Sequence, residues 1–253
     1  MTSILITGAS SGIGAATARA AALSGRYDRI FITGWRNPDK LKEVRDEANT
    51  IAQGRMALER SSSGSEEICT MSVGDIGDIN YVEELHTLTG PVDVIINNAS
   101  IAHYGLLIDL TPDEWSRIVS TNLTSVYNVC HTYLRDMISK KQGKIINISS
   151  VWGEAGASCE VAYSACKGAV NTFTKALARE MAPSNIQINA VSFGMVDTAM
   201  NAHLSEEELS ELIDEIPAGR IMMSDEAAEA ILKVVELPDY MTGQIITFDG
   251  GWR

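Results

Sequence analysis

The sequence predicts an α/β fold: a doubly wound parallel sheet with helices on both faces, in a single domain spanning residues 1–253. Short apolar runs rich in β-branched residues alternate with helical patterns along the whole chain, which is typical of a parallel sheet buried on both faces. No proline-rich or low-complexity linker divides the chain. We expect strands at residues 4–7, 30–33, 68–73, 92–96, 144–148, 186–191 and 244–248.

Helices are expected between these strands, and two of them have clear boundaries. An alanine-rich helix over residues 15–23 follows the first strand. Asn37 and Pro38 have the pattern of an N-cap and a first-turn proline, and predict a helix that runs toward Gln53. Residues 54–67, which contain the run SSSGS, are interpreted as a loop or a frayed helix end.

Two further helices show capping or charge signals. Thr111, Pro112 and Glu114 have the pattern of a capping box, so a helix should enter near Trp115. The acidic run at residues 205–215 is interpreted as a solvated helix, because a charge run usually is one. A lid over a site is the alternative for this segment, but its charge alone does not favour it.

Composition restricts the class of function. A net charge of -13 argues against binding to nucleic acid or to an anionic membrane, since both need a cationic surface. No apolar run approaches the roughly 20 residues that span a bilayer. The cysteines and histidines show no zinc or disulfide spacing, so we expect no metal site and a reduced, cytoplasmic protein. These residues are Cys69, Cys130, Cys159, Cys166, His86, His103, His131 and His203.

A glycine-rich turn joins the first strand to the helix at residues 15–23. Glycines here let the backbone approach a pyrophosphate, whose charge then lies at the helix N-terminus. The spacing is GxxxGxG rather than GxGxxG, but the strand before the turn and the helix after it supply the context of a dinucleotide site. The residues expected to bind the cofactor here are Gly8, Ser10, Ser11, Gly12, Ile13 and Gly14.

The residues after the second strand indicate which dinucleotide binds. An acidic side chain would hold the free ribose hydroxyl of NAD, but residues 34–37 read GWRN and the first acid is Asp39. Arg36 can instead pair with a ribose phosphate. We therefore predict NADP(H), with NAD(H) as the less favoured alternative.

Tyr163 and Lys167 stand one helical turn apart in the run AYSACKGAVNTFTKALARE, so their side chains leave the same face. An ammonium beside a phenol stabilises the phenolate, so we expect Lys167 to lower the pKa of Tyr163. Taken alone, such a pair is more often two polar residues of an amphipathic helix. The other motifs of the chain make it a candidate acid/base pair.

The motifs TGASSGIG, NNAS, NISS and YSACK, together with a helical asparagine, resemble in their order the short-chain dehydrogenase/reductase family in its compact form of about 250 residues. The resemblance covers essentially the whole chain and implies a Rossmann-type sheet of seven strands with a nicotinamide cofactor. It also implies four catalytic residues, Asn122, Ser150, Tyr163 and Lys167.

Each of these four residues carries a role that the resemblance implies. Tyr163 would exchange a proton with the substrate oxygen, and Lys167 would bind the nicotinamide ribose and tune the phenol. Ser150 would hold the substrate oxygen; its neighbour Ser149 is the rival, although strand alternation points it to the other face. Asn122 would hold a water behind Lys167 and complete a proton relay.

Further cofactor contacts follow from the same resemblance. They are Asp75 and Ile76 at the adenine, Asn98 and Ala99 at the adenosine ribose, and Val196 and Thr198 at the carboxamide. Two positions depart from the family pattern: Ser100 replaces the glycine of NNAG, and Phe193 replaces the proline before Gly194. Phe193 could line the nicotinamide side of the pocket. We expect both departures to alter local geometry and not the chemistry.

The resemblance implies hydride transfer between NADP(H) and a carbonyl or secondary alcohol. The layout is closest to 3-oxoacyl-carrier-protein reductases, and Arg179 and Lys141 match two carrier-docking positions, with Lys140 and Lys144 near Lys141. A solvated basic patch is an equal alternative for these residues. The substrate, small or carrier-bound, would contact residues 195–217.

Two alternatives stay open at this point. The substrate could be a free ketone, a sugar or a steroid-type alcohol. The chain could also be an NADP-binding regulatory protein without catalysis, although all four catalytic positions are filled. Helix packing in the family implies a homotetramer.

Overall fold

The computed structural model describes residues 2–58, 67–202 and 204–253. Within them the strands are β1 (Ser3–Thr7), β2 (Arg29–Gly34), β3 (Cys69–Val73), β4 (Val94–Asn97), β5 (Gly143–Ser150), β6 (Ile186–Phe193) and β7 (Ile245–Phe248). They form one parallel sheet in the order β3-β2-β1-β4-β5-β6-β7. The expected seven-stranded, Rossmann-type sheet is therefore confirmed.

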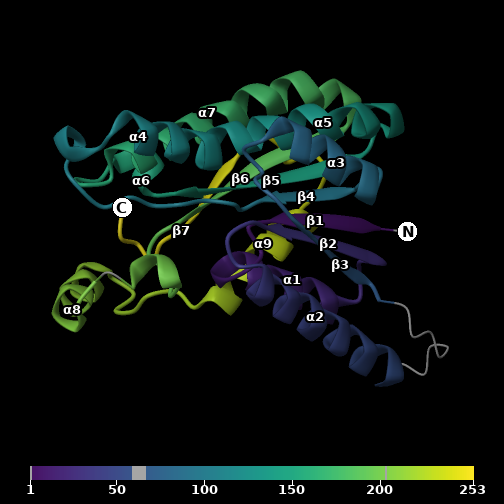
Figure 1. Cartoon of the computed structure of the whole chain (residues 1–253), viewed down its shortest axis with the longest axis horizontal. Helices are drawn as coiled ribbons and strands as arrows, with labels where there is room; N and C mark the ends of the chain where they lie inside the picture. Colours follow the sequence, from purple (N-terminus) through teal and green to yellow (C-terminus); the bar gives the residue numbers. More distant parts are fainter. Residues whose placement is uncertain (1, 59–66, 203) are drawn as a thin grey trace.

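Helices cover both faces of this sheet. Their bounds are α1 (Gly12–Ser24), α2 (Pro38–Leu58), α3 (Ile79–Thr89), α4 (Pro112–Val119), α5 (Ser125–Lys140), α6 (Trp152–Ala155), α7 (Val161–Met181), α8 (Glu206–Glu215) and α9 (Ser224–Glu236). In Figure 1, α1, α2 and α9 lie below the sheet, and α3, α5 and α7 lie above it. Helix α8 stands apart from both layers, at the side where the chain ends.

The central strands supply the core of both layers. Ile4 and Ile6 of β1 pack with α1 and α9, whereas Leu5, which points to the opposite face, packs with α3 and α5. All three side chains are fully buried. Burial of such an aliphatic side chain stabilises the fold by about 1.5–3 kcal/mol, so the layers hold the strand ends in fixed positions.

The helix that begins at Pro38 extends to Leu58, so of the two expectations for this segment the loop is wrong for residues 54–58, which form the end of the helix. A Cβ built on Gly54 would meet no described atom within 4 Å, which shows that this glycine marks neither a turn nor a close approach. The run of serines in the expected loop lies outside the described residues.

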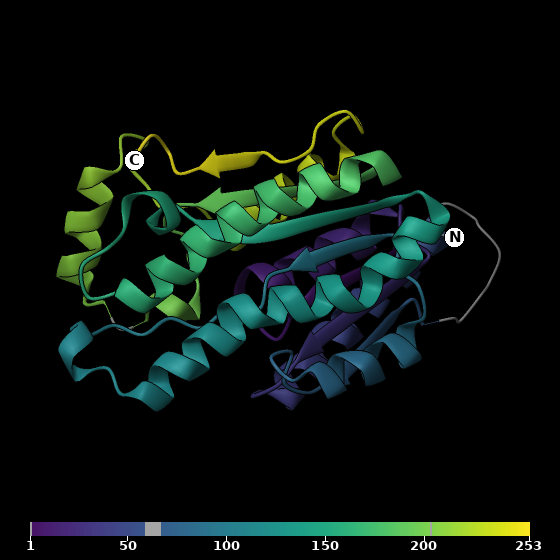
Figure 2. The same ribbon diagram turned by 90° about the horizontal axis from the view of Figure 1, so that it is seen from above.

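The capping box at Thr111 is confirmed, with Thr111 Oγ1 accepting from the Glu114 N–H at 3.3 Å. The helix it starts continues through a π-helical turn, η2 (Ser120–Thr124), into α5. Figure 2 shows α4 and α5 as one long rod beside α7. Among the described residues no helix is both long enough and apolar enough to cross a bilayer.

Candidate active site

A cavity of about 1180 Å³ opens at the carboxyl ends of the strands. Strands β1 and β4 are neighbours there although they are not consecutive in the chain, which is the place where parallel α/β sheets bind ligands. The loops after β1 to β4 line one half, and the ends of β5 and β6 with α7 and α8 line the other. Every residue predicted for the site lines this cavity except Gly14 and Asn122.

The glycine turn is shaped by close backbone contacts. Gly8 has φ +67°, and a Cβ on it would lie 2.6 Å from the Cα of Ala99. A Cβ on Gly14 would lie 2.4 Å from the carbonyl oxygen of Gly8, so Gly14 allows α1 to pack on the turn instead of lining the cavity. A Cβ built on Gly12 would lie 3.1 Å from the methyl carbon of Thr198, so these two residues of the cavity wall lie side by side. This open backbone cradle at the start of α1 fits a pyrophosphate.

The far end of this half fits an adenosine group. Asn98 Nδ2 donates to the carbonyl oxygens of Thr7 and Gly8 at 2.9 and 3.0 Å, which fixes the turn against the loop after β4. The exposed Arg36 lies with its guanidinium 5.9 Å from the ring centroid of Trp35. Asp75 closes the loop after β3 by accepting from the Gly77 N–H at 2.9 Å.

Helix α7 brings the lysine into the interior of the site. Lys167 is 2% exposed, and its Nζ donates to the carbonyl oxygen of Ile148 at 2.8 Å. Burial lowers the pKa of Lys167 to about 8. The ammonium lies 5.4 Å from the ring centroid of Tyr163, so the expected pairing on one helix face is present.

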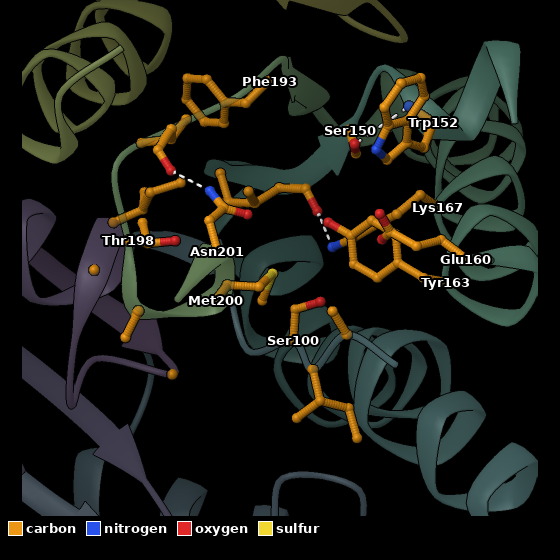
Figure 3. A pocket seen from close by; sticks show the side chains of 18 of the residues that line it. Ser100, Ser150, Trp152, Glu160, Tyr163, Lys167, Phe193, Thr198, Met200 and Asn201 are labelled. Carbon is orange, nitrogen blue, oxygen red and sulfur yellow. Dashed lines mark hydrogen bonds between the residues drawn. The ribbon is translucent and has the colours of Figure 1, made fainter. Parts of the chain in front are cut away.

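Tyr163, the candidate acid/base residue, differs from the expectation in one respect. Burial raises the pKa of Tyr163 well above its usual value, and the nearby carboxylate of Glu160 raises it further. The expected net lowering of this pKa is therefore wrong, because burial disfavours the charged phenolate more than the neighbouring groups favour it. Hydrogen bonds with Ser150 and Ser100 act in the opposite direction and lower the pKa. Figure 3 shows Tyr163 between Ser150 and Ser100.

The two neighbouring serines at the end of β5 have different contacts. Ser149 Oγ donates to the carbonyl oxygen of Lys167 at 3.4 Å, so its hydroxyl is already bonded to the backbone of α7. Ser150 Oγ accepts from the Trp152 N–H at 3.2 Å and also reaches the phenol of Tyr163. Ser150 is thus the serine placed to hold a substrate oxygen.

Asn122 lies behind the cavity wall, 1% exposed, within the π-helical turn. Its Oδ1 accepts from the Ile101 N–H at 2.8 Å, and its Nδ2 donates to the Ile101 carbonyl at 2.8 Å. Ser100 Oγ donates to the same Oδ1 at 3.2 Å. The amide therefore holds the loop after β4 and is linked to Tyr163 through Ser100.

Several cavity residues were not predicted from the sequence. Trp152 and Trp252 meet edge to face, with ring centroids 5.0 Å apart, and the guanidinium of Arg253 lies 4.4 Å from the Trp252 ring centroid. Glu215 at the end of α8 accepts from the Trp252 Nε1 and from Arg253, both at 3.2 Å. A tryptophan two residues after Ser150 was the available signal for this aromatic corner.

The acidic segment is a helix with the expected exposure, yet it also lines the cavity. α8 starts with a capping box in which Ser205 Oγ accepts from the Glu208 N–H. Glu208, Glu211 and Leu212 face the cavity, so the lid interpretation, which charge alone did not favour, agrees with this position. Phe193 lines the cavity as expected and contacts Phe248 at a centroid distance of 6.1 Å.

Two of the basic residues considered with the carrier-docking positions lie at the amino end of the strands, opposite the end where the cavity opens. Lys140 and Lys144 flank the start of β5, which is about 25 Å from its end at Ser150. Lys140 pairs with Asp93 at 3.4 Å, and Lys144 pairs with Asp239 at 3.0 Å. Lys140 and Lys144 therefore lie far from the cavity of the same chain.

Known proteins are similar to this chain in sequence and in structure. The family model for short chain dehydrogenase matches residues 2–209. The uncharacterized oxidoreductase YmfI of Bacillus subtilis is 36% identical over 98% of this chain and 98% of its own. The 3-oxoacyl-[acyl-carrier-protein] reductase FabG of Aquifex aeolicus is 35% identical over 98% of this chain and 95% of its own.

Solved structures agree with these relatives. A 3-oxoacyl-[acyl-carrier protein] reductase from Brucella melitensis superposes with a TM-score of 0.87 at 28% identity, covering 100% of this chain and 91% of its own. A protein assigned as a gluconate dehydrogenase from Agrobacterium tumefaciens gives 0.85 at 29% identity, covering 99% and 95%. With the tyrosine, lysine and serine gathered at the sheet edge, these matches show that the chain belongs to the short-chain dehydrogenase/reductase family and is an oxidoreductase.

Proposed function

We propose that the protein is an NADPH-dependent reductase of 3-oxoacyl thioesters. The observation that carries the reaction type is the contact of Tyr163 with Ser150 and Lys167 in one cavity with the glycine turn. The thioester is supported by the reductases named FabG among the relatives and by the apolar side chains around the catalytic end, including Trp152, Met200 and Leu204.

The chain's own residues divide the work of reduction. The glycine turn and the loops after β2 to β4 would hold the dinucleotide, whose reduced nicotinamide supplies hydride to the carbonyl carbon. Ser150 donates a hydrogen bond to the carbonyl oxygen, and Tyr163 gives that oxygen its proton. Lys167, whose Nζ is held by the Ile148 carbonyl, would bind the ribose of the dinucleotide beside Tyr163.

Use of NADPH is supported by Arg36, which lies at the adenosine end, and by the absence of an acidic residue at positions 34–37. Arg36→Ala should weaken NADPH binding about tenfold or more and leave NADH binding nearly unchanged, because a charge-assisted bond to the phosphate is lost. Titration of both cofactors by fluorescence measures this. If the wild type binds NADH more tightly and the variant keeps that order, the NADP assignment is wrong.

The substrate is tested by the rate of NADPH consumption with acetoacetyl thioesters of coenzyme A and of an acyl carrier protein, beside free ketones and sugar acids. We expect thioesters to give the highest kcat/KM. The gluconate dehydrogenase assignment of one structural neighbour favours a sugar acid as the second candidate. Tight NADPH binding without turnover of any carbonyl would instead support a regulatory protein.

We further propose that each chain folds as a single domain, that four chains associate as a homotetramer, and that the protein is cytoplasmic. Exposed apolar side chains on the loop before α4 and on α4 itself support association; they are Leu106, Leu107, Ile108 and Trp115. The free cysteines at four described positions agree with a reducing compartment. Light scattering that gives a monomer mass would contradict the tetramer.

A further inference from the structure

We propose that Ser100 is a further catalytic residue, which donates a hydrogen bond to the phenolate oxygen left when Tyr163 has given its proton to the substrate. Glycine is usual at this position in the family, so the hydroxyl is a feature of this chain. The inference rests on the proposed acid/base role of Tyr163. It also revises the expectation that this departure changes local geometry alone.

Ser100 and Ser150 approach the phenol from two neighbouring strands. Ser100 lies three residues beyond the end of β4, and Ser150 is the last residue of β5, which pairs with β4. Both side chains line the cavity, and both lie near enough to the phenol to lower the pKa of Tyr163. In Figure 3, Ser100 projects toward Tyr163 from the side opposite Ser150. The phenol therefore lies between two hydroxyl groups.

Asn122 controls the direction of the Ser100 hydroxyl. Its amide is fixed at both ends by the backbone of Ile101, with two bonds of 2.8 Å, so its Oδ1 must face the loop that carries Ser100. Ser100 Oγ donates to this Oδ1 at 3.2 Å. While that bond exists, Ser100 Oγ can accept the O–H of neutral Tyr163. The π-helical turn brings Asn122 to this position.

Proton transfer changes which bond Ser100 makes. During reduction the O–H bond of Tyr163 breaks, its proton bonds to the substrate oxygen, and the electron pair stays on the phenolate. Rotation about the Cβ–Oγ bond of Ser100 then turns its O–H from Asn122 to the phenolate. Asn122 Oδ1 keeps its bond from Ile101, so no buried acceptor is left unpaired. No proton is gained or lost by Ser100, and oxidation runs the same change backwards.

Burial and the charged groups around the phenol disfavour the Tyr163 phenolate, so a hydrogen bond from Ser100 would stabilise it. On α7, Glu160 and Cys166 raise the pKa of Tyr163, as does burial, and Lys167 is directed to Ile148. From the other elements that line the cavity, the titratable or charged side chains are Arg36, Asp75, Tyr104, Glu208, Glu211, Glu215 and Arg253. Of these, Arg253 is paired with Glu215. A phenolate at Tyr163 therefore depends on nearby hydroxyl donors.

The pH dependence of activity tests the inference. Ser100→Ala and Ser100→Gly are compared with Ser100→Thr, which keeps the hydroxyl, and with Ser116→Ala on α4, which is exposed and outside the cavity. Loss of one bond to a charged oxygen should raise the midpoint of the acidic limb of kcat/KM for alcohol oxidation by about one pH unit and lower kcat about tenfold. The KM for NADP⁺ and the Tm should stay unchanged, and Ser100→Thr should behave like the wild type.

A second measurement needs neither substrate nor cofactor. With carbon-13 at the tyrosine Cζ, the resonance of Tyr163 is assigned by its loss in Tyr163→Phe. It should shift in Ser100→Ala or Ser100→Gly and not in Ser116→Ala, because the bond at the phenol oxygen is lost. If Ser100→Ala does not fold, Ser100→Gly, the usual family residue, gives the same test.

The outcomes separate this inference from the proposed function. An active Ser100→Ala or Ser100→Gly enzyme with the wild-type pH midpoint would overturn the role of Ser100 alone, as would Ser100→Thr that is no better than Ser100→Ala. Full turnover by Tyr163→Phe would overturn the acid/base role of Tyr163, and the inference with it.

Discussion

Helices α7 and α8 line the same cavity, but they are held in place in different ways. α7 buries eight residues against the sheet and its neighbours, among them Lys167. None of the ten residues of α8, all of them described, is buried. α8 is fixed instead by the capping box at Ser205 and by the contacts of Glu215 with Trp252 and Arg253. Core packing thus positions Tyr163 and Lys167, the proposed proton-transfer groups, on α7, which we call the rigid wall. A few surface contacts position α8, the proposed substrate wall.

This difference explains how one fold can keep its chemistry and change its substrate. A displacement of α7 would disturb the main core on one face of the sheet, which is costly because protein interiors are close-packed. A displacement of α8 disturbs a small cluster that includes Trp252, Ile216 and Leu212. We infer that local opening of α8 requires much less free energy than opening of α7.

The largest effect should follow from removing the acid on the rigid wall. Tyr163→Phe keeps the ring and its packing but removes the transferable proton, so kcat should fall by about 10² to 10⁴. NADPH binding, followed by fluorescence, should stay within about threefold of the wild type. Tyr240→Phe, at a fully exposed tyrosine, is the matched control and should change neither quantity. Turnover at the wild-type rate in Tyr163→Phe would contradict the role of α7.

The sequence predicts the strands, the glycine turn and the pair of residues on α7 well, since each has a signal in a short stretch of the chain. The strand runs are confirmed: the central strands are buried segments, while β3 and β7 at the two edges are only partly buried. The glycine turn is confirmed because Gly8 and Gly14 sit where a Cβ would clash with backbone. Tyr163 and Lys167 share a face because they are one helical turn apart. The sequence signal for each of these features lies in residues that are close in the chain or in the period of one element, even where the contact it serves, such as that of Gly8 with Ala99, is distant in sequence.

The substrate wall depends on contacts between distant segments, which no local pattern encodes. Glu215 meets Arg253 across 38 positions of sequence, and Trp152 meets Trp252 across a longer separation. The pKa of Tyr163 was mispredicted for a similar reason: burial by the whole fold outweighs the neighbour four residues away. The extension of α2 through Gly54 shows that a single glycine only weakly disfavours a helix that packs on the sheet.

A smaller effect on the rigid wall should appear as a pH dependence of stability. The unfolded chain keeps the Lys167 proton up to about pH 10.5, whereas burial lowers its pKa to about 8 in the folded state. Between these values the unfolded state binds more protons, so the free energy of unfolding rises with pH. Relative to Lys167→Met, the wild type should gain up to about 3 kcal/mol across this window.

Urea denaturation at several pH values between 8 and 10 measures this gain. Lys175→Met replaces an exposed lysine of the same helix, and its difference from the wild type should not change with pH. A difference for Lys167→Met that stays flat or falls as pH rises would show that the buried lysine is not destabilised by its charge.

The smallest effect should come from loosening the substrate wall. Ser205→Ala removes the cap of α8, a loss of about 1 kcal/mol. Because α8 buries no residue, this loss should appear as local fraying, with an increase of a few-fold in substrate KM and little change in kcat, NADPH binding or Tm. Thr111→Ala removes the same kind of capping box from α4, whose residues do not line the cavity, and should leave substrate KM unchanged. If both variants raised KM equally, or if Ser205→Ala lowered Tm by as much as a core substitution, α8 would be as firmly integrated as α7 and the contrast between the two walls would be wrong.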